Sequence, residues 1–375
     1  MEQVDYILIG PSYPYRGGIA ETQNELAQSL INSGKKVKLY TFKKLYPNFL
    51  FPGKDQYIKN KSKPESLNIN RFIHSYNPIN WFLVSKKINN TNPKVVIFRY
   101  YTPFLSICYY NLMIRLNNKI KLVALVDNWI PHEPKSFDKI LNKLFSKKIN
   151  KFLTLSSNVA SELKKDNKFP VFSGFHPISK SLPKKLPKSD SRKKLDWDIK
   201  SPIVLFYGLI RSYKGLDLLI KSFDEPPLNR SNVKLAIVGE FYEPINKYKK
   251  LIAKLKLENR IYIIPKFANE ELTQLCFSSA DMISLTYKSA TQSGVIPLAY
   301  HYRTPVLASN LLGLKTPIEK DKTGMICSQN PVDISIKIDK MLNSNEKKFF
   351  IKNIGSSIKY YTWNKYSKEI INFIE

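Results

Sequence analysis

Two cations follow a short apolar run in the second half of the chain, in the segment YGLIRSYKGLDLL. Arg211 and Lys214 lie three residues apart between Gly208 and Gly215, where a strand is expected to end and a helix to begin. A guanidinium and an ammonium beside the free N–H groups of a helix start can bind a diphosphate. The alternative is a pair of solvated charges, although basic side chains in a first turn oppose the helix dipole unless an anion compensates them. The spacing therefore predicts an anion site.

A glycine-rich loop near the start of the chain, GPSYPYRGGIAE, is the second candidate. Gly17 and Gly18 stand directly before an expected helix over 19–33, where missing side chains let a phosphate or a sugar approach the backbone. The loop lacks GxGxxG spacing, so a dinucleotide site is not supported. A tight turn without a ligand remains the alternative.

A hydroxyl-rich loop, TYKSATQSGV, is the third candidate. Thr291, Ser293 and Gly294 precede an apolar helix, so backbone N–H groups and hydroxyls could form an anion-binding nest. The alternative is an ordinary serine cap of that helix. Both interpretations stay open on the sequence alone.

Short apolar strands alternating with helical patterns must position these loops. Apolar runs without alternation indicate strands buried on both faces, as in a parallel sheet covered by helices. Ligands of such sheets bind beyond the carboxyl ends of the strands. The expected strands are residues 6–9, 37–40, 95–98, 122–126 and 152–155 in the first half, and 203–207, 234–238, 261–264, 282–285 and 306–308 in the second.

The organisation of the chain follows from this alternation and from where it stops. The segment SKSLPKKLPKSDSRKKLDWDIK has two prolines, many lysines and no sustained periodicity, which predicts an exposed basic linker at 181–200. We therefore expect an α/β protein with two Rossmann-like doubly wound domains, 1–180 and 201–360. A last helix at 361–375 has no strand after it and is expected to pack back on the first domain.

Charge and cysteine usage limit the function classes. Lys and Arg outnumber Asp and Glu by 60 to 30, a net charge of +30 at pH 7, which favours an anionic partner such as nucleic acid, anionic lipid or a phosphorylated small molecule. A codon bias toward Lys explains part of the excess equally well. Three scattered cysteines fit neither a disulfide framework nor a zinc site, and no signal peptide or spanning segment is visible. These features predict a cytoplasmic protein.

Several segments together resemble the retaining family 4 glycosyltransferases of the GT-B fold, in particular bacterial members that build surface polysaccharides. The resemblance is carried, in order along nearly the whole chain, by IGPSYPYRGGIAETQNELAQSLINSGKKVKLYTF, GLIRSYKGLDLLIKSF, KLAIVGEFY, SGVIPLAYHYRTPVLAS, Gly313 and KTG at 322–324. It implies two Rossmann-like domains facing a central cleft, a nucleoside-diphosphate sugar bound mainly by the C-terminal domain, and an acceptor bound mainly by the N-terminal domain. It also implies no metal and no further cofactor.

The resemblance also implies roles for particular residues. Arg211 and Lys214 match the pair that binds the donor diphosphate and stabilises the leaving phosphate, and Asp127 and His132, with Asn128, fall where the family orients the sugar. The residues that match donor-binding positions are Gly17, Gly18, Glu240, Thr291, Gln292, Ser293, Gly294 and Val295.

One departure from the family pattern is plain. The family commonly carries two glutamates eight positions apart around the last loop, yet no acidic residue occurs between Asp281 and Glu319, and Thr291 and Ala299 stand near the expected places. Which sugar and which base are bound is therefore left open.

Two basic segments predict contact with an anionic membrane. The helical pattern 136–149 places Phe137, Ile140, Leu141 and Leu144 on one face and lysines on another, and the loop 42–54 mixes aromatic with basic residues. For the helix, the favoured alternative is an apolar stripe that faces the core, with the lysines in solvent.

These observations predict a metal-independent, retaining glycosyltransferase that acts in cell-surface polysaccharide synthesis. Its partners would be a nucleotide sugar and a glycan or lipid-linked acceptor, with peripheral contact at the inner face of the plasma membrane. The missing glutamates favour the alternative of a catalytically weak GT-B subunit that binds glycan or a partner enzyme. Nucleic-acid binding rests on charge alone and lacks a reader motif, so no nucleic-acid partner is expected.

Overall fold

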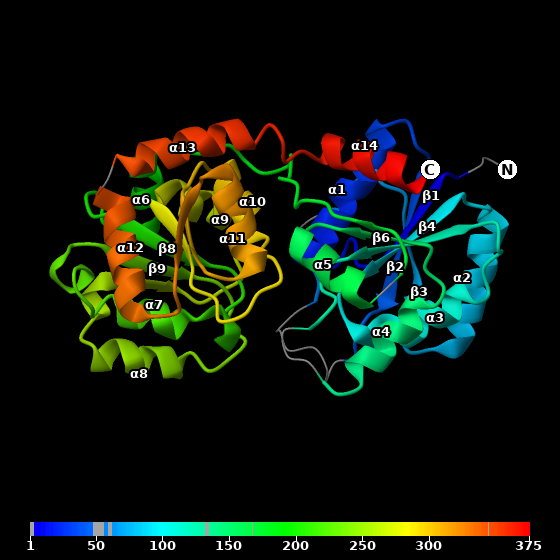
Figure 1. Cartoon of the computed structure of the whole chain (residues 1–375), viewed down its shortest axis with the longest axis horizontal. Helices are drawn as coiled ribbons and strands as arrows, with labels where there is room; N and C mark the ends of the chain where they lie inside the picture. Colours follow the sequence, from blue (N-terminus) through cyan, green and yellow to red (C-terminus); the bar gives the residue numbers. More distant parts are fainter. Residues whose placement is uncertain (1–3, 48–55, 59–61, 132–134, 167, 344) are drawn as a thin grey trace. The chain divides into compact units, whose positions relative to one another are not determined.

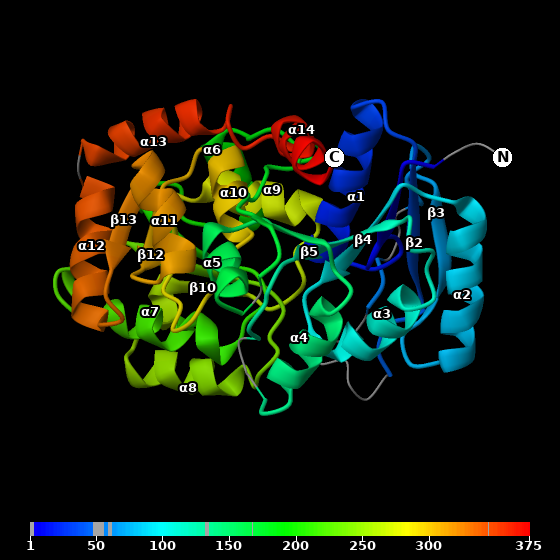
Figure 2. The same cartoon turned by 45° about the vertical axis from the view of Figure 1, so that its right-hand side comes forward.

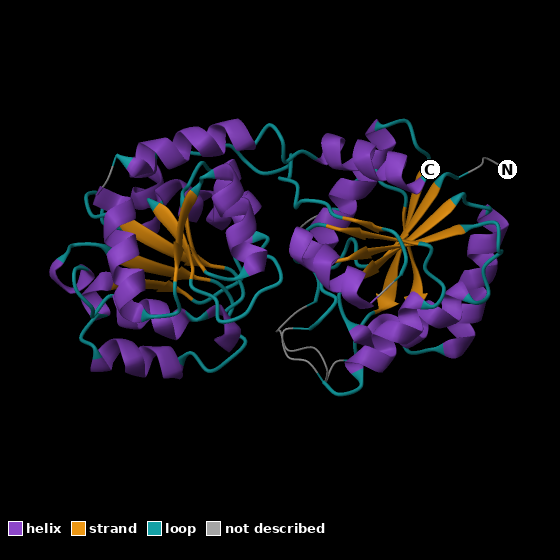
Figure 3. Ribbon diagram, viewed as in Figure 1, coloured by secondary structure: helices purple, strands orange, loops and turns teal. Residues whose placement is uncertain are grey.

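The structure is a computed structural model that describes residues 4–47, 56–58, 62–131, 135–166, 168–343 and 345–375 (Figure 1). The chain divides into two compact units. Unit 1 contains residues 1–179 and the C-terminal segment 362–375, and unit 2 contains residues 180–361. Each unit has a parallel sheet with helices on both faces (Figure 3), so the expected α/β architecture of two Rossmann-like domains is confirmed.

Unit 1 is built on a seven-stranded sheet of order β3-β2-β1-β4-β5-β6-β7, in which all neighbouring strands are parallel. The order reverses between β1 and β4, where Tyr6–Ile9 aligns with Val95–Phe98. The strands are β1 (Tyr6–Ile9), β2 (Val37–Lys44), β3 (Ile69–His74), β4 (Val95–Tyr100), β5 (Lys121–Val126), β6 (Lys151–Thr154) and β7 (Val171–Phe172).

Helices cover both faces of this sheet. On one face α1 packs against α14, the red helix of Figure 1, which confirms that the last helix returns to the N-terminal unit. On the other face α3 packs against both α2 and α4. The helices are α1 (Gly18–Asn32), α2 (Pro78–Thr91), η2 (Pro103–Leu105), α3 (Ser106–Met113), α4 (Asp138–Ser146), α5 (Ser157–Asp166) and α14 (Trp363–Ile374).

Unit 2 has a six-stranded parallel sheet of order β10-β9-β8-β11-β12-β13, which reverses between β8 and β11. Its strands are β8 (Ile203–Tyr207), β9 (Lys234–Val238), β10 (Ile261–Ile264), β11 (Met282–Leu285), β12 (Val306–Ser309) and β13 (Gly324–Cys327). Its helices are α6 (Lys188–Leu195), η3 (Ser212–Lys214), α7 (Leu216–Ser222), η4 (Leu228–Arg230), α8 (Asn246–Lys254), η5 (Glu258–Arg260), α9 (Glu270–Ser279), α10 (Val295–His301), α11 (Leu312–Asp321), α12 (Pro331–Asn343) and α13 (Glu346–Ser357).

The segment expected to be an irregular linker differs from that expectation, because α6 forms within it. Arg192 of α6 is buried, and its guanidinium donates to the backbone carbonyls of residues 198, 199, 201 and 279 and to Asp281. The helix has few apolar residues, so periodicity does not reveal it. Buried polar contacts of Arg192, together with the ion pair between Lys188 and Asp281, attach it to unit 2 instead.

Candidate functional site

The loops that carry the predicted anion-binding residues of unit 2 leave neighbouring strands at the same edge of the sheet. They follow β9, β8 and β11, which lie side by side around the point where the strand order reverses. Gly208 and Gly239 are in direct contact, because a Cβ at Gly239 would lie 1.8 Å from the carbonyl oxygen of Gly208. Gly239 also has φ +154, so only glycine allows these two loops to meet.

Lys214 is the most unusual charge at this edge. Its side chain is 8% exposed, and within the described part of the chain its ammonium has neither a hydrogen-bond acceptor nor a carboxylate partner. Lys214 Nζ lies 5.3 Å from the ring centroid of Tyr287. A Cβ at Gly208 would lie 3.1 Å from the same nitrogen. Burial lowers the pKa of Lys214 below 10.5, and the nearby Arg211 charge lowers it further. A buried cation without an anion is costly, so the position favours an anionic ligand.

Arg211 lies at the start of η3 with its guanidinium over the ring of Tyr242, 4.9 Å from the centroid. The Tyr242 backbone N–H donates to the carbonyl of Ile210 at 3.0 Å, which fixes the ring beside the arginine. The side chain is half-buried and keeps its charge near solvent. The structure therefore brings both predicted cations to one loop at the carboxyl edge of β8.

The predicted residues after β11 and β9 border the same loop. A Cβ at Gly208 would lie 4.0 Å from Val295 Cγ2. The ring of Tyr287 lies beside Lys214, and its hydroxyl is 3.5 Å from Ser293 Oγ. Glu240 is buried, and its carbonyl accepts from the N–H of Ile210 at 2.9 Å.

The predicted nest at 291–295 has a local role as well. The hydroxyl of Ser293 accepts from the N–H of Val295 at 3.3 Å, but the N-cap residue of α10 is Gly294 and no side chain caps this helix. Thr291 is buried, and its carbonyl lies 2.1 Å from where a Cβ of Gly313 would be, so α11 begins directly against this loop. Gln292 is half-buried and Gly294 is exposed. The ordinary serine cap is therefore not formed, and the anion-binding nest stays a prediction.

The glycine loop of unit 1 leaves β1 at the corresponding reversal of strand order. Gly17 adopts φ +100 at the N-terminus of α1, and its carbonyl accepts from the N–H of Glu21 at 3.1 Å. A Cβ at Gly17 or Gly18 would meet nothing within 4 Å among the described residues. No described side chain therefore covers the start of this 15-residue helix, and binding of a phosphate or sugar there stays a prediction.

Asp127, predicted to orient the sugar, is part of a buried ion pair, and its role toward a sugar stays a prediction. It follows β5 and binds the buried Arg99 of β4 through two hydrogen bonds, from Nε to Oδ2 at 2.5 Å and from Nη2 to Oδ1 at 2.6 Å. Nη2 also donates to Thr22 Oγ1 of α1 at 2.8 Å. Arg99 thus ties Asp127 to the helix that carries the glycine loop.

Sequence reasoning missed Arg99 and its neighbour His176. A charged residue inside the apolar strand VVIFRY was the available signal for Arg99. The sequence gives no such signal for His176. Burial lowers the pKa of its imidazole, and the charges of Arg99 and Asp127 also act on it. The predicted His132 lies outside the described residues, so its role stays a prediction.

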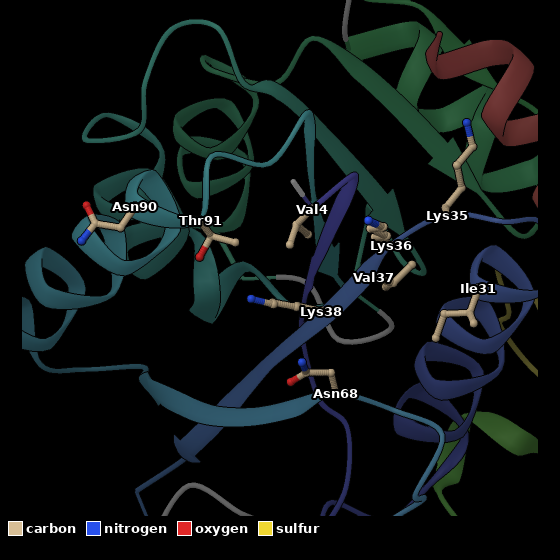
Figure 4. Close-up of a pocket in the computed structure, with 9 residues that line it drawn as sticks. All are labelled: Val4, Ile31, Lys35, Lys36, Val37, Lys38, Asn68, Asn90 and Thr91. Atoms are coloured by element: carbon tan, nitrogen blue, oxygen red, sulfur yellow. The ribbon is translucent and has the colours of Figure 1, made fainter. Parts of the chain in front are cut away.

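A pocket of about 560 Å³ opens at the opposite edge of the unit 1 sheet, where β2 begins (Figure 4). Because ligands of parallel sheets bind at the carboxyl edge, this pocket is not the predicted site. It is lined by Val4, Ile31, Lys35, Lys36, Val37, Lys38, Asn68, Asn90 and Thr91.

The described residues contain no group of three or more His, Cys, Asp or Glu side chains placed to hold a metal ion. None of their helices combines the length and apolar character that crossing a bilayer takes.

Part of the chain matches a known protein family, and several known proteins resemble the chain in sequence. Residues 187–355, somewhat under half of the chain, match the family described as Glycosyl transferases group 1. An uncharacterised glycosyltransferase of Methanocaldococcus jannaschii is 25% identical over 64% of this chain and 62% of its own length. A D-inositol 3-phosphate glycosyltransferase of Xylanimonas cellulosilytica is 23% identical over 36% of this chain and 32% of its own length. The chain thus matches less than two thirds of these relatives.

Solved structures resemble the whole chain at low sequence identity. A sucrose-phosphate synthase of Thermosynechococcus elongatus superimposes with a TM-score of 0.78 at 15% identity over 98% of both chains. The Anabaena protein HepE, solved in complex with UDP, gives 0.76 at 13% identity over 99% of both chains. Residues 187–355 are therefore similar to the Glycosyl transferases group 1 family, and the chain as a whole has the GT-B fold of these structures.

Proposed function

We propose that this protein is a retaining glycosyltransferase that moves a hexose-type sugar from a nucleoside-diphosphate sugar to a glycan or lipid-linked acceptor. The observation that carries the proposal is the buried ammonium of Lys214, which has no anionic partner among the described residues and lies beside Arg211 and Gly208. This arrangement sits in the group 1 domain, at the edge of the sheet where ligands of such folds bind. A donor diphosphate supplies the missing negative charge.

In this proposal Arg211 and Lys214 act on the leaving group. When the sugar–phosphate bond breaks, negative charge develops on the diphosphate, and two preorganised cations stabilise it. Backbone N–H groups at 291–295 would complete the contacts to the phosphates. Neutralisation by the protein's own groups makes the transfer metal-independent, and no cofactor besides the donor substrate is needed.

A retaining transfer by front-face attack needs positioning more than a strong base. The acceptor hydroxyl would enter on the face from which the diphosphate leaves, and the departing phosphate oxygen would take its proton. Asp127, held by Arg99, then acts through the placement of α1, while Gly17 and Gly18 admit the reacting groups to the backbone.

The donor class is supported by a structural neighbour. Anabaena HepE has been solved with UDP and with UDP-glucose. We extend this to a nucleotide sugar for the present chain, and we place the reaction in cell-surface polysaccharide synthesis on the cytoplasmic side of the plasma membrane. The base and the sugar remain to be measured, because no acidic residue between Asp281 and Glu319 provides the usual contacts.

A panel of nucleotide sugars in a thermal-shift assay tests the donor. A ligand that binds the native state raises Tm by mass action, so at least one UDP, GDP or ADP sugar should raise it. Arg211→Ala and Lys214→Ala should each abolish that shift and transfer. The control Lys250→Ala, an exposed lysine of α8, should change neither. Unchanged activity in both site variants would remove the diphosphate role.

The absence of acidic residues between Asp281 and Glu319 favours a second candidate, a catalytically weak GT-B subunit that binds glycan or a partner enzyme. The same panel separates the two, because a pure scaffold binds none of the nucleotides.

A further inference from the structure

The helix layer α2, α3 and α4 of unit 1 exposes large apolar side chains. In both Figure 1 and Figure 2 the three helices follow one another along one side of the unit 1 sheet, and α3 packs against both neighbours. We call the seven large apolar residues that these helices expose the α2–α4 face. It consists of Ile79, Phe82, Leu83, Ile107, Ile114, Phe137 and Ile140, which are between 43% and 75% exposed.

The structure corrects the preferred interpretation of the helix predicted at 136–149. Its apolar stripe was expected to face the core, but Phe137 is 50% and Ile140 71% exposed. The inward side is polar and aromatic instead: Asn142 accepts from the Tyr100 hydroxyl at 2.6 Å, and Phe145 stacks on the same ring at 4.0 Å. This network satisfies the inward side of α4, while Phe137 and Ile140 point to solvent and Leu141 and Leu144 are half-buried.

The described part of the second segment expected to meet lipid buries apolar side chains and exposes Lys43 and Lys44. Phe42 and Leu45 are buried in the core of unit 1. Residues 48–54 of that loop lie outside the described residues.

The same helices carry an almost one-sided charge. No acidic residue occurs from Ser66 to Val126, a stretch that contains all of α2 and α3. Within α4 the one carboxylate, Asp138, is buried and accepts from the N–H of Lys135 at 2.8 Å. The exposed basic residues on and beside the three helices are Lys86, Lys87, Arg115, Lys119, Lys135, Lys139, Lys143, Lys147 and Lys148.

We propose that the α2–α4 face docks on the surface of an anionic lipid bilayer. Apolar side chains such as Phe82 and Ile140 would enter the boundary between headgroups and acyl chains, while the lysines around them contact anionic headgroups. The apolar atoms leave water, and each basic group near the surface adds electrostatic attraction to the anionic headgroups. The arrangement brings the protein to a lipid surface without a spanning helix.

Charge decides between a membrane and a second copy of the chain. A symmetric dimer through this face would place the same patch on both subunits, so basic groups would meet basic groups. Repulsion between like charges disfavours that contact. An anionic bilayer satisfies both the apolar and the basic part of the face.

The proposal goes beyond the transfer reaction and does not depend on it. If the acceptor is lipid-linked, docking also brings the enzyme to its substrate. Vesicle binding is measured without donor or acceptor, so its outcome is separate from that of the donor experiments.

Vesicle cosedimentation tests the docking. The full-length protein should bind vesicles of 70% phosphatidylcholine and 30% phosphatidylglycerol at least tenfold more tightly than vesicles of phosphatidylcholine alone, and salt should weaken the binding. The double variant Phe82→Glu/Ile140→Glu should lose at least tenfold of the affinity for anionic vesicles. The matched control Leu312→Glu/Ile336→Glu changes equally exposed apolar residues of α11 and α12 in unit 2, and it should bind like the wild type.

Two readouts keep the result interpretable. Circular dichroism and Tm should be unchanged in both double variants, because all four side chains are exposed. Lys214→Ala should bind vesicles like the wild type, so loss of donor binding and loss of docking are distinguishable.

Three outcomes would overturn the proposal. They are equal binding to neutral and anionic vesicles, wild-type affinity in Phe82→Glu/Ile140→Glu, and no vesicle binding together with a dimer in sedimentation that this variant dissociates. The last outcome would assign the face to a second copy.

Discussion

Lys214 differs from an ordinary surface lysine because its folded surroundings oppose its charge. Burial lowers its pKa below 10.5, so between that lowered value and 10.5 the unfolded chain binds more protons than the native protein. Stability therefore gains a contribution as pH rises through this window. Binding of an anionic ligand should favour the charged form of Lys214, so the lysine takes up a proton when the ligand binds.

This gives a pH prediction for Lys214. As pH rises toward 10.5 the wild type should gain stability relative to Lys214→Met, in urea unfolding measured at a series of pH values. Calorimetry of nucleotide binding over the same pH series, in two buffers of different ionisation enthalpy, should show proton uptake in the wild type and less in the variant. The comparison with the variant matters because Lys185, whose pKa burial lowers to about 8, contributes to the wild-type curve as well.

The pair Arg99–Asp127 gives a second prediction at this scale. Removing one partner of a buried ion pair leaves the other charge uncompensated, which typically costs about 3–5 kcal/mol. Arg99→Met and Asp127→Asn should therefore each lower the free energy of unfolding in urea by about this amount.

A sugar-orienting role for Asp127 gives a different result. Asp127→Asn would then reduce kcat while stability stays within about 0.5 kcal/mol of the wild type. Measuring unfolding and transfer on the same variant separates the two roles.

At the scale of elements, the carboxylate directly before β11 contacts three other segments of unit 2. Asp281 accepts from Arg192 and Lys188 of α6, from Lys347 of α13 and from the N–H of Ile203 at the start of β8, at 2.6 to 2.9 Å. Burial alone would raise its pKa, but the ammonium groups of Lys347 and Lys188 lower it well below 3.8. The carboxylate is therefore an organising contact for α6 and α13.

Asp281→Asn should destabilise the protein by about 3–5 kcal/mol at pH 7, because it removes the charge that these cations share. The native pKa is below the unfolded value, so the stabilisation is present above about pH 4 and is lost as pH falls below it. Urea unfolding at pH 7 and pH 3.5 checks both statements. Asp217→Asn, which loses a partly exposed pair with Lys288, should cost at most about 1 kcal/mol; an equal loss in both variants would contradict the role of Asp281.

The elements also show what sequence patterns can and cannot predict. Apolar runs such as 203–207 and 234–238 are strands with the expected bounds, because burial on both faces leaves a clear signal. The strand INRFIH at 69–74 lacks that signal. Helix α6 was hidden because buried polar contacts, rather than an apolar stripe, fix its position.

The candidate functional site could likewise be predicted only in part from the sequence. Arg211 and Lys214 are close in sequence, so their shared loop was predictable. The meeting of Arg99 with Asp127 depends on β4 lying beside β5, which residue spacing does not show.

At the scale of the whole molecule, the net charge of +30 no longer requires nucleic acid as partner. Some of the basic groups would bind a diphosphate in unit 2, and others would bind a lipid surface on unit 1. The two uses lie on different units, so variants should separate them.

Metal dependence is a property of the whole reaction. If the protein's own cations neutralise the diphosphate, transfer in 5 mM EDTA should match transfer with added Mg²⁺ within about twofold. A loss of tenfold or more that Mg²⁺ or Mn²⁺ restores would show that a metal shares this task.

The central claim is that the diphosphate of a nucleotide sugar meets Lys214. Calorimetric titration of UDP, GDP and ADP into the EDTA-treated protein tests it most directly. A charge-assisted hydrogen bond contributes about 1.5–3 kcal/mol, so at least one nucleotide should bind the wild type about 10- to 100-fold more tightly than Lys214→Met, with Lys250→Met like the wild type. Equal affinity in the wild type and Lys214→Met, or no binding of any of the three nucleotides, would contradict the account.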